Sequence, residues 1–218
     1  MLDYLQTTAV IQISGIAGCF FTALGILIAA IPYRGKQGER YSPLNHFISE
    51  LGEAGVSRLA WVFNLGLILG GISLLPCCIG LGWVIPGAWS KLGMSVGCLA
   101  SIALALVGVF PMNNLKAHSR AATAFFRLAL LMILSFTLAI GSQNDNAAVL
   151  PKTISLVGVP AVLSYMFFLI YSPIAFRSTE NGLEQKLEKR PRFWLLTIAE
   201  WLIFITTIPW FFAIALGL

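Results

Sequence analysis

The stretch SRLAWVFNLGLILGGISLLPCCIGLGWV, residues 57–84, decides the fold class, because after Arg58 it contains no charged side chain. An α-helix rises about 1.5 Å per residue, so roughly 20 apolar residues cross a hydrocarbon core about 30 Å thick. Lipid offers no water to the backbone polar groups, and a helix pairs these groups within the segment itself. We therefore expect residues 57–84 to form a transmembrane helix.

Five further segments repeat this pattern, and the composition of the whole chain agrees with them. Of the 218 residues 58% are hydrophobic and only 11% are charged, whereas roughly a quarter are charged in a soluble domain. The additional spans are expected at about 9–32, 89–111, 121–142, 149–172 and 194–217. The sequence thus predicts one all-α domain over residues 1–218, a six-transmembrane-helix bundle of a polytopic membrane protein.

The basic residues predict how this bundle is oriented. Six spans place both termini on one side, and Lys and Arg accumulate in cytoplasmic connections. The first, third and fifth connections hold eleven of them: Arg34, Lys36, Arg40, Arg58, Lys116, Arg120, Arg177, Lys186, Lys189, Arg190 and Arg192. The opposite side holds only Lys91 and Lys152. We expect an N-out, C-out orientation, in the inner membrane of a prokaryotic cell.

Several function classes are disfavoured by the same residues. The net charge of +5 is explained by topology, so we expect no nucleic-acid partner. The four cysteines lie inside expected spans without a disulfide framework or metal-ligand spacing, and no metal, nucleotide or other cofactor motif is present. The N-terminal segment carries Asp3 and no basic residue, so we do not expect a cleaved signal peptide.

Three costly polar residues lie inside the expected spans: Asn64, Arg127 and Glu200. If their helices begin near residues 57, 121 and 194, each lies six or seven positions from the helix start, about 10 Å deep. Arg127 and Glu200 would then be candidates for a direct or water-linked contact. This polar layer is either a structural pair that fixes helix packing or the floor of a cavity open to the cytoplasm.

The stretch HFISELGE, residues 46–53, would lie at the mouth of that cavity. His46, Ser49 and Glu50 would share one face of a short interfacial helix, as a Ser–His–Glu set requires. A helix-cap role for Ser49, with acidic residues at the helix start, is the simpler explanation. Without a G-x-S-x-G nucleophile elbow, hydrolysis by Ser49 is disfavoured.

The second histidine belongs to the connection after the third span, where Asn113 and His118 would lie on the same face of the membrane as His46. Both histidines titrate near neutral pH when unperturbed, so each could act as an acid, a base or a donor to phosphate. The simpler reading of each is an interfacial side chain that bonds a loop carbonyl.

Two blocks, HFISELGEAGVSRLAWVFNLGLILGG and LVGVFPMNNLKAHSRAATAFF, resemble a prokaryotic membrane family, the domain of unknown function 998. The matching positions are Ser49, Leu51, Gly52, Phe63, Asn64, Gly66, Gly108, Phe110, Pro111, His118, Ala121, Ala122, Phe125 and Phe126. A more distant similarity is to DRAM-type autophagy modulators and GPI-anchor remodelling proteins, six-helix membrane proteins tied to lipid handling. The resemblance implies the six-span fold and one site shared by both blocks.

Three functional hypotheses follow from the sequence. The leading one is a cytoplasm-facing pocket that binds a membrane lipid or small amphiphile, with Asn64, Arg127 and Glu200 as its floor. His46, Ser49, Glu50, Asn113 and His118 would form the rim, where an anionic head group could meet Arg127 and the histidines. The alternatives are a membrane-embedded hydrolase or transferase that uses His46 and His118, and a structural accessory subunit.

Overall fold

Six long helices build the protein, as the sequence predicts. The structure, a computed structural model, describes residues 2–177 and 190–218, with side chains from residue 7 to 175 and from 190 onward. The long helices are α1 (Leu2–Ala30), α2 (Ala60–Val84), α3 (Ala88–Val109), α4 (Leu115–Gly141), α5 (Thr153–Arg177) and α7 (Leu195–Gly217). All six are long and apolar enough to cross a membrane, and the described residues contain no β-strand.

The helices form a closed ring. Each packs against the helix that precedes it and the one that follows, and α7 packs on α1 to complete the circle. Contacts across the ring are almost absent in the described residues, so only side chains reach its centre. The contacts that α5 and α7 make are sparser than those among α1 to α4. The ring is therefore more loosely closed on the α4–α5–α7–α1 side.

The dense packing of α1 against α2 depends on a close approach of their two backbones. A Cβ atom on Gly66 of α2 would lie 2.7 Å from the carbonyl oxygen of Phe21 and 2.9 Å from the Cα of Gly25 in α1. Real side chains do not tolerate such distances, so α1 and α2 meet this closely only because both positions are glycine.

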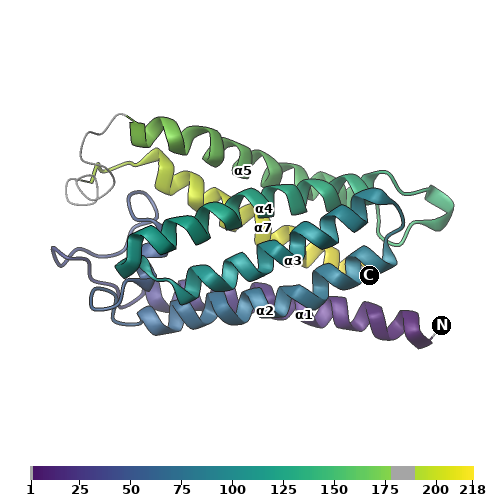
Figure 1. The fold of residues 1–218 in the computed structure, drawn as a ribbon, viewed down its shortest axis with the longest axis horizontal. Coiled ribbons are helices and arrows are strands. Elements are labelled where there is room, and N and C mark those ends of the chain that lie inside the picture. The colour runs from purple at the N-terminus through teal and green to yellow at the C-terminus, as the bar shows by residue number, and fades with distance from the viewer. Residues whose placement is uncertain (1, 178–189) are drawn as a thin grey trace.

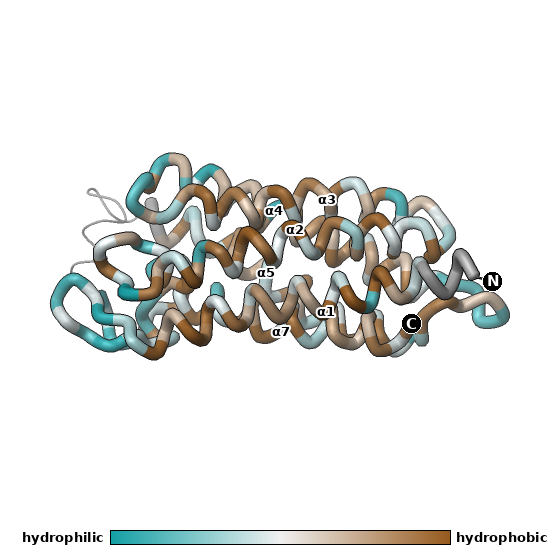
Figure 2. Tube along the Cα trace, turned by 90° about the horizontal axis from the view of Figure 1, so that it is seen from below, coloured by the Kyte–Doolittle hydropathy of each residue, from teal (hydrophilic) through white to brown (hydrophobic). Residues whose placement is uncertain are grey.

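Both chain ends lie at one end of the bundle, and three connections lie at the other (Figure 1). We call this second end the loop end; it holds residues 31–59, 110–114 and 190–194. Hydrophilic residues gather in the connections, while the helices between them are largely apolar (Figure 2). The loop end is the one for which the basic residues predict a cytoplasmic location, and that orientation stays a prediction.

The start of α4 differs from the expectation. The helix begins at Leu115 rather than near residue 121, because the Asn114 side chain accepts a hydrogen bond from the N–H of Ala117 (3.2 Å) and caps it. Arg127 therefore lies twelve positions after the helix start, about 18 Å, whereas Glu200 lies five positions into α7 and Asn64 four into α2. The common depth expected for these three residues is not present.

Candidate functional site

The long connection after α1 folds over the loop end of the ring. It contains a short 3-10 helix, η1 (Ile48–Gly52), which contacts α1, α2 and α7. Phe47 packs edge-to-face on Trp194, with 4.9 Å between the ring centroids. The backbone N–H of Trp194 also donates to the carbonyl of Leu44 (2.8 Å). The connection is thereby fixed to the segment that leads into α7.

A second connection is attached to it by Asn113, one of the predicted rim residues. Asn113 Oδ1 accepts from the N–H of Ala54 and its Nδ2 donates to the carbonyl of the same residue, both at 2.8 Å. Asn64 acts in a similar way, because its Nδ2 donates to the carbonyl of Gly52 at the end of η1 (3.1 Å). The two asparagines thus hold backbone segments in place, and neither lines the cavity described below.

A buried ion pair stands at the centre of the loop end. Glu50, whose side chain is 4% exposed, accepts hydrogen bonds from Arg190 Nη1 (3.2 Å, to Oε1) and Nη2 (3.0 Å, to Oε2). The carboxylate also accepts from the backbone N–H of Phe47 (2.7 Å) and from the Tyr33 hydroxyl (3.5 Å). Arg190 donates further to the carbonyl of Asn45 (3.1 Å). This arrangement gives a buried carboxylate the partners that it requires.

His46 lies in the same cluster, between two tyrosines. Its ring centroid is 5.5 Å from that of Tyr33 and 5.3 Å from that of Tyr41. Nδ1 accepts from the N–H of Ser42 (3.2 Å), so the neutral ring carries its proton on Nε2, which faces Glu39 Oε1 at 3.7 Å. Burial lowers the pKa of His46, and this effect and nearby Arg190 outweigh the opposing effects of Glu50 and Glu39. The ring is therefore neutral at pH 7.

The acidic and phenolic groups around His46 are shifted as well. Burial alone would raise the pKa of Glu39. Hydrogen bonds from backbone N–H groups, among them that of Gln37 (2.9 Å), and the charge of Arg190 have the opposite effect and are stronger. The pKa of Glu39 is therefore lowered. Burial and the nearby Glu50 carboxylate raise the pKa of Tyr33. Burial, followed by the charge of Glu200, raises the pKa of Tyr41. The cluster thus combines two carboxyl groups and one arginine with neutral rings.

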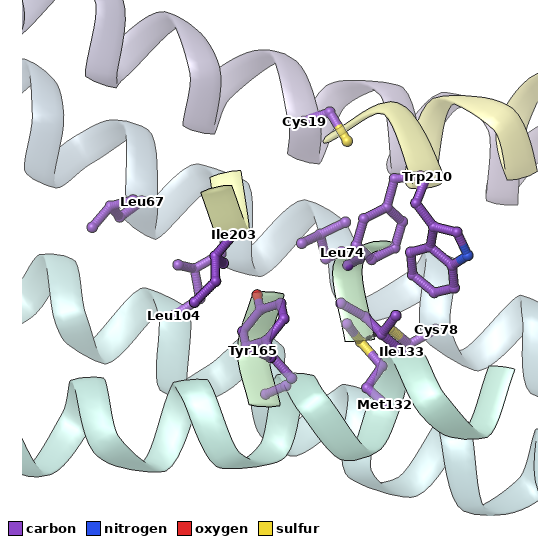
Figure 3. Packing of buried hydrophobic residues seen from close by; sticks show 14 of the residues in the cluster. Cys19, Leu67, Leu74, Cys78, Leu104, Met132, Ile133, Tyr165, Ile203 and Trp210 are labelled. Atoms are coloured by element: carbon purple, nitrogen blue, oxygen red, sulfur yellow. Dashed lines mark hydrogen bonds between the residues drawn. The ribbon is translucent and has the colours of Figure 1, made fainter. Parts of the chain in front are cut away.

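Below this cluster the ring encloses a cavity of about 270 Å³. Side chains from all six long helices line it, and most of them are apolar. Cys19, Leu67, Leu104, Met132, Tyr165 and Ile203 represent one helix each (Figure 3). Figure 3 shows several of these side chains directed into the space between the helices. The size is near the lower limit of roughly 300–1,000 Å³ for ligand sites.

Three of the predicted polar residues lie at the loop end of this cavity: Ser49, His118 and Glu200. Glu200 Oε2 accepts from the backbone N–H of Ile48 (2.7 Å), and Oε1 accepts no hydrogen bond from the described residues. His118 Nδ1 lies 2.8 Å from the carbonyl of Phe110, so Nδ1 donates and Nε2 of the neutral ring is an acceptor. The Ser49 hydroxyl donates to Met112 Sδ (3.4 Å). His118 and Ser49 therefore present acceptors, and Glu200 presents a carboxyl oxygen.

Arg127 does not lie with these three residues at the cavity. Its side chain is exposed on α4 and does not line the cavity. Among the ion pairs of the described residues, none joins Arg127 to Glu200, so the contact considered from the sequence is not formed. The carboxylate that does pair with an arginine is Glu50.

The two histidines also have separate surroundings. His118 lines the cavity, whereas His46 belongs to the cluster around Glu50 and does not line the cavity. The Ser49–His46–Glu50 set is likewise divided, since Ser49 bonds Met112 and Glu50 bonds Arg190. The four cysteines are free thiols, and in the described part of the chain no group of His, Cys, Asp or Glu could hold a metal ion.

Sequence reasoning missed Arg190, Glu39 and the two tyrosines that surround His46. Arg190 is one of eleven basic residues in the connections, and nothing in its local sequence separates it from the other ten. Tyr41 is fixed by Trp201, whose Nε1 donates to the hydroxyl (3.1 Å). Only the folding of the first connection onto α7 brings these residues together, and this contact has no sequence signal.

Six membrane-spanning helices around an apolar cavity define a polytopic α-helical membrane protein. The family model described as "Protein of unknown function (DUF998)" matches residues 16–217. The chain belongs to this family, and the predicted resemblance is confirmed. No curated protein and no solved structure matches the chain. The more distant likeness to DRAM-type proteins and the prokaryotic inner-membrane location stay predictions.

Proposed function

We propose that the protein binds one lipid or small amphiphile in the central cavity, with the chain among the apolar side chains and the head group at the loop end. The observation that carries this proposal is Glu200, a carboxyl group on the wall of a largely apolar cavity, with one oxygen that bonds no described residue. A polar group inside a membrane is costly, and its usual reason is a ligand or a partner.

The chemistry of the loop end selects the head group. His118 Nε2 and the Ser49 oxygen are hydrogen-bond acceptors, Glu200 adds a carboxyl oxygen, and the lining residues include no Lys or Arg. A neutral head group with donors, such as hydroxyls, complements this set. An anionic carboxylate does not, because the lining residues offer it no cation in a medium of low dielectric constant. This revises the anionic head group that the sequence suggested for the pocket.

A comparison of two ligands tests the proposal. The purified protein in detergent is offered a monoacylglycerol and a fatty acid of the same chain length, and bound ligand is measured by native mass spectrometry. We expect the wild type to retain the monoacylglycerol in preference to the fatty acid. Glu200→Gln replaces the carboxyl group at the head-group position by an amide of the same shape that presents donors of its own, so this preference should fall at least about tenfold. Equal retention of the two ligands by the wild type would overturn the choice of head group.

A second pair of variants tests whether the cavity is where the chain binds. Ala122→Trp places a large ring in the cavity, whereas Ala124→Trp adds the same ring on the exposed side of the same helix. Ligand should be lost from the first variant and kept by the second. Retention by both would mean that the ligand lies elsewhere. A wild type that retains neither amphiphile would favour the accessory-subunit alternative, and turnover of the monoacylglycerol would favour the enzyme.

A further inference from the structure

Three basic side chains lie along one exposed face of α4. Lys116, Arg120 and Arg127 follow at intervals of four and seven residues, and Thr123 stands between the last two. Such intervals place all four on a single stripe of the helix surface. We call these four residues the α4 basic stripe. All four are exposed.

The stripe lacks anionic partners in the part of the chain that the structure describes. None of the ion pairs found there includes Lys116, Arg120 or Arg127, and neither α4 nor α5 contains an Asp or Glu. Among the three, Arg127 has the greatest need of a counter-ion, because exposed apolar side chains such as Leu131 lie next to it along the helix. A guanidinium group in that position requires a counter-ion.

The direction of α4 brings these charges toward the membrane surface. Helical side chains lean toward the helix N-terminus, and that of α4 lies at the loop end. A long Arg127 side chain, although twelve positions into the helix, thus extends toward Thr123 and Arg120, as basic side chains in a membrane do when they reach for the interface. Lys116 and Arg120 then lie nearest the depth at which lipid phosphates are found, and Arg127 reaches toward that depth from below.

We propose that the α4 basic stripe is a binding site for an anionic phospholipid of the surrounding membrane, with the lipid phosphate held by Arg120 and Arg127. Charge complementarity selects this partner, since three cations that have no anionic partner among the described residues face the lipid layer and hydroxyl groups lie between them. The site does not depend on an occupied cavity.

The position of the stripe connects it to the cavity. Ser119 and Thr123 are exposed on α4 and also line the cavity, as does Ser172 on the facing part of α5. The contacts between α4 and α5 are among the sparser ones of the ring. The cavity thus reaches the surface beside the stripe, and a lipid held there stands at its opening. This role as a point of access rests on the proposed function.

The test is lipid binding to the purified full chain in nanodiscs made either of phosphatidylcholine alone or with phosphatidylglycerol of the same acyl chains. Retained lipid is measured by native mass spectrometry. The wild type should prefer phosphatidylglycerol, and Arg120→Gln and Arg127→Gln should each reduce that preference about fivefold. Arg127→Lys keeps the charge and should retain most of the preference.

Arg58→Gln is the matched control, because it removes one exposed basic residue from the same end of the bundle. The preference should remain unchanged in this variant. The proposal is overturned if Arg58→Gln lowers the preference as much as Arg127→Gln does, or if the wild type does not distinguish the two lipids. Monoacylglycerol retained by Arg127→Gln would show that the cavity binds its ligand whatever the fate of the stripe.

Discussion

Arg190 binds the carboxylate of Glu50 through two hydrogen bonds, of 3.2 and 3.0 Å, across 140 residues of sequence. The pair joins the first long connection to the segment that enters α7. Both elements contribute to the cavity wall, through Phe47, Ile48 and Ser49 on one side and Glu200 on the other. The ion pair therefore fixes the loop end of the proposed binding site without contacting the ligand.

Removing the two partners of this pair should have unequal effects. The Arg190 side chain is 17% exposed and can turn to water when Glu50 is replaced, whereas Glu50 stays buried when Arg190 is removed. We expect Arg190→Ala to lower the free energy of unfolding by about 3 kcal/mol and Glu50→Gln by roughly half as much. Thermal unfolding in detergent measures both.

Lys36→Ala provides the control for that experiment. Lys36 pairs with Glu53 at 2.9 Å, but its side chain is 68% exposed, so its loss should cost less than about 1 kcal/mol. Equal losses for Lys36→Ala and Arg190→Ala would show that burial of the Glu50 pair contributes nothing.

The contribution of His46 to stability should decrease when the pH falls below about 6.5. Burial lowers the pKa of His46 in the folded state, so the unfolded chain binds the proton first. The contribution is present in full above the pKa that His46 has in the unfolded chain, and it is lost as the pH falls through the lower pKa of the folded state. We expect the melting temperature of the wild type to decline from pH 7 to pH 5 relative to that of His46→Gln.

His46→Gln identifies the group responsible for this decline. The variant cannot titrate at this position, and Glu39 beside it has a lowered pKa and loses its contribution only below its usual value of about 4.5. The melting temperature of His46→Gln should therefore vary less between pH 7 and pH 5. An unchanged slope would assign the dependence to another residue.

Gly66→Ala should loosen the contact between α1 and α2. The added methyl group would meet the carbonyl oxygen of Phe21 and the backbone of Gly25, neither of which can move aside as a side chain does. We expect a loss of about 1–3 kcal/mol, the range of overpacked cores. Gly141→Ala is the matched change, because its new Cβ lies 3.5 Å from the Ser155 side chain, an ordinary contact. If the two variants unfold at the same temperature, the glycine contact is not limiting.

The sequence was sufficient for the fold, because span length and hydrophobicity are local properties that lipid imposes on every transmembrane helix. It also identified Ser49, His118 and Glu200, since polar residues in an apolar chain are conspicuous. It failed for Arg127, because the depth of a residue depends on where its helix begins, and the cap at Asn114 extends α4 by six residues. Pairing partners such as Arg190 depend on how connections fold, which no local pattern records.

Neutralising the two buried glutamates should change the free energy of unfolding in opposite directions. Glu50 has an arginine and two further donors within its cluster, whereas Glu200 has one backbone donor and no cation within ion-pair distance among the described residues. Glu200→Gln keeps the shape of the side chain and an acceptor for the N–H of Ile48, and it removes a poorly compensated charge. We expect the ligand-free variant to be more stable than the wild type by about 1–2 kcal/mol.

Thermal unfolding of the delipidated protein at pH 8.5, where a carboxylate is most fully ionised, measures this difference. A gain in stability together with loss of the monoacylglycerol preference is the pattern of a residue that serves binding at the expense of stability. If Glu200→Gln instead destabilises the protein as Glu50→Gln does, Glu200 has a structural partner and its carboxylate is not kept for a ligand.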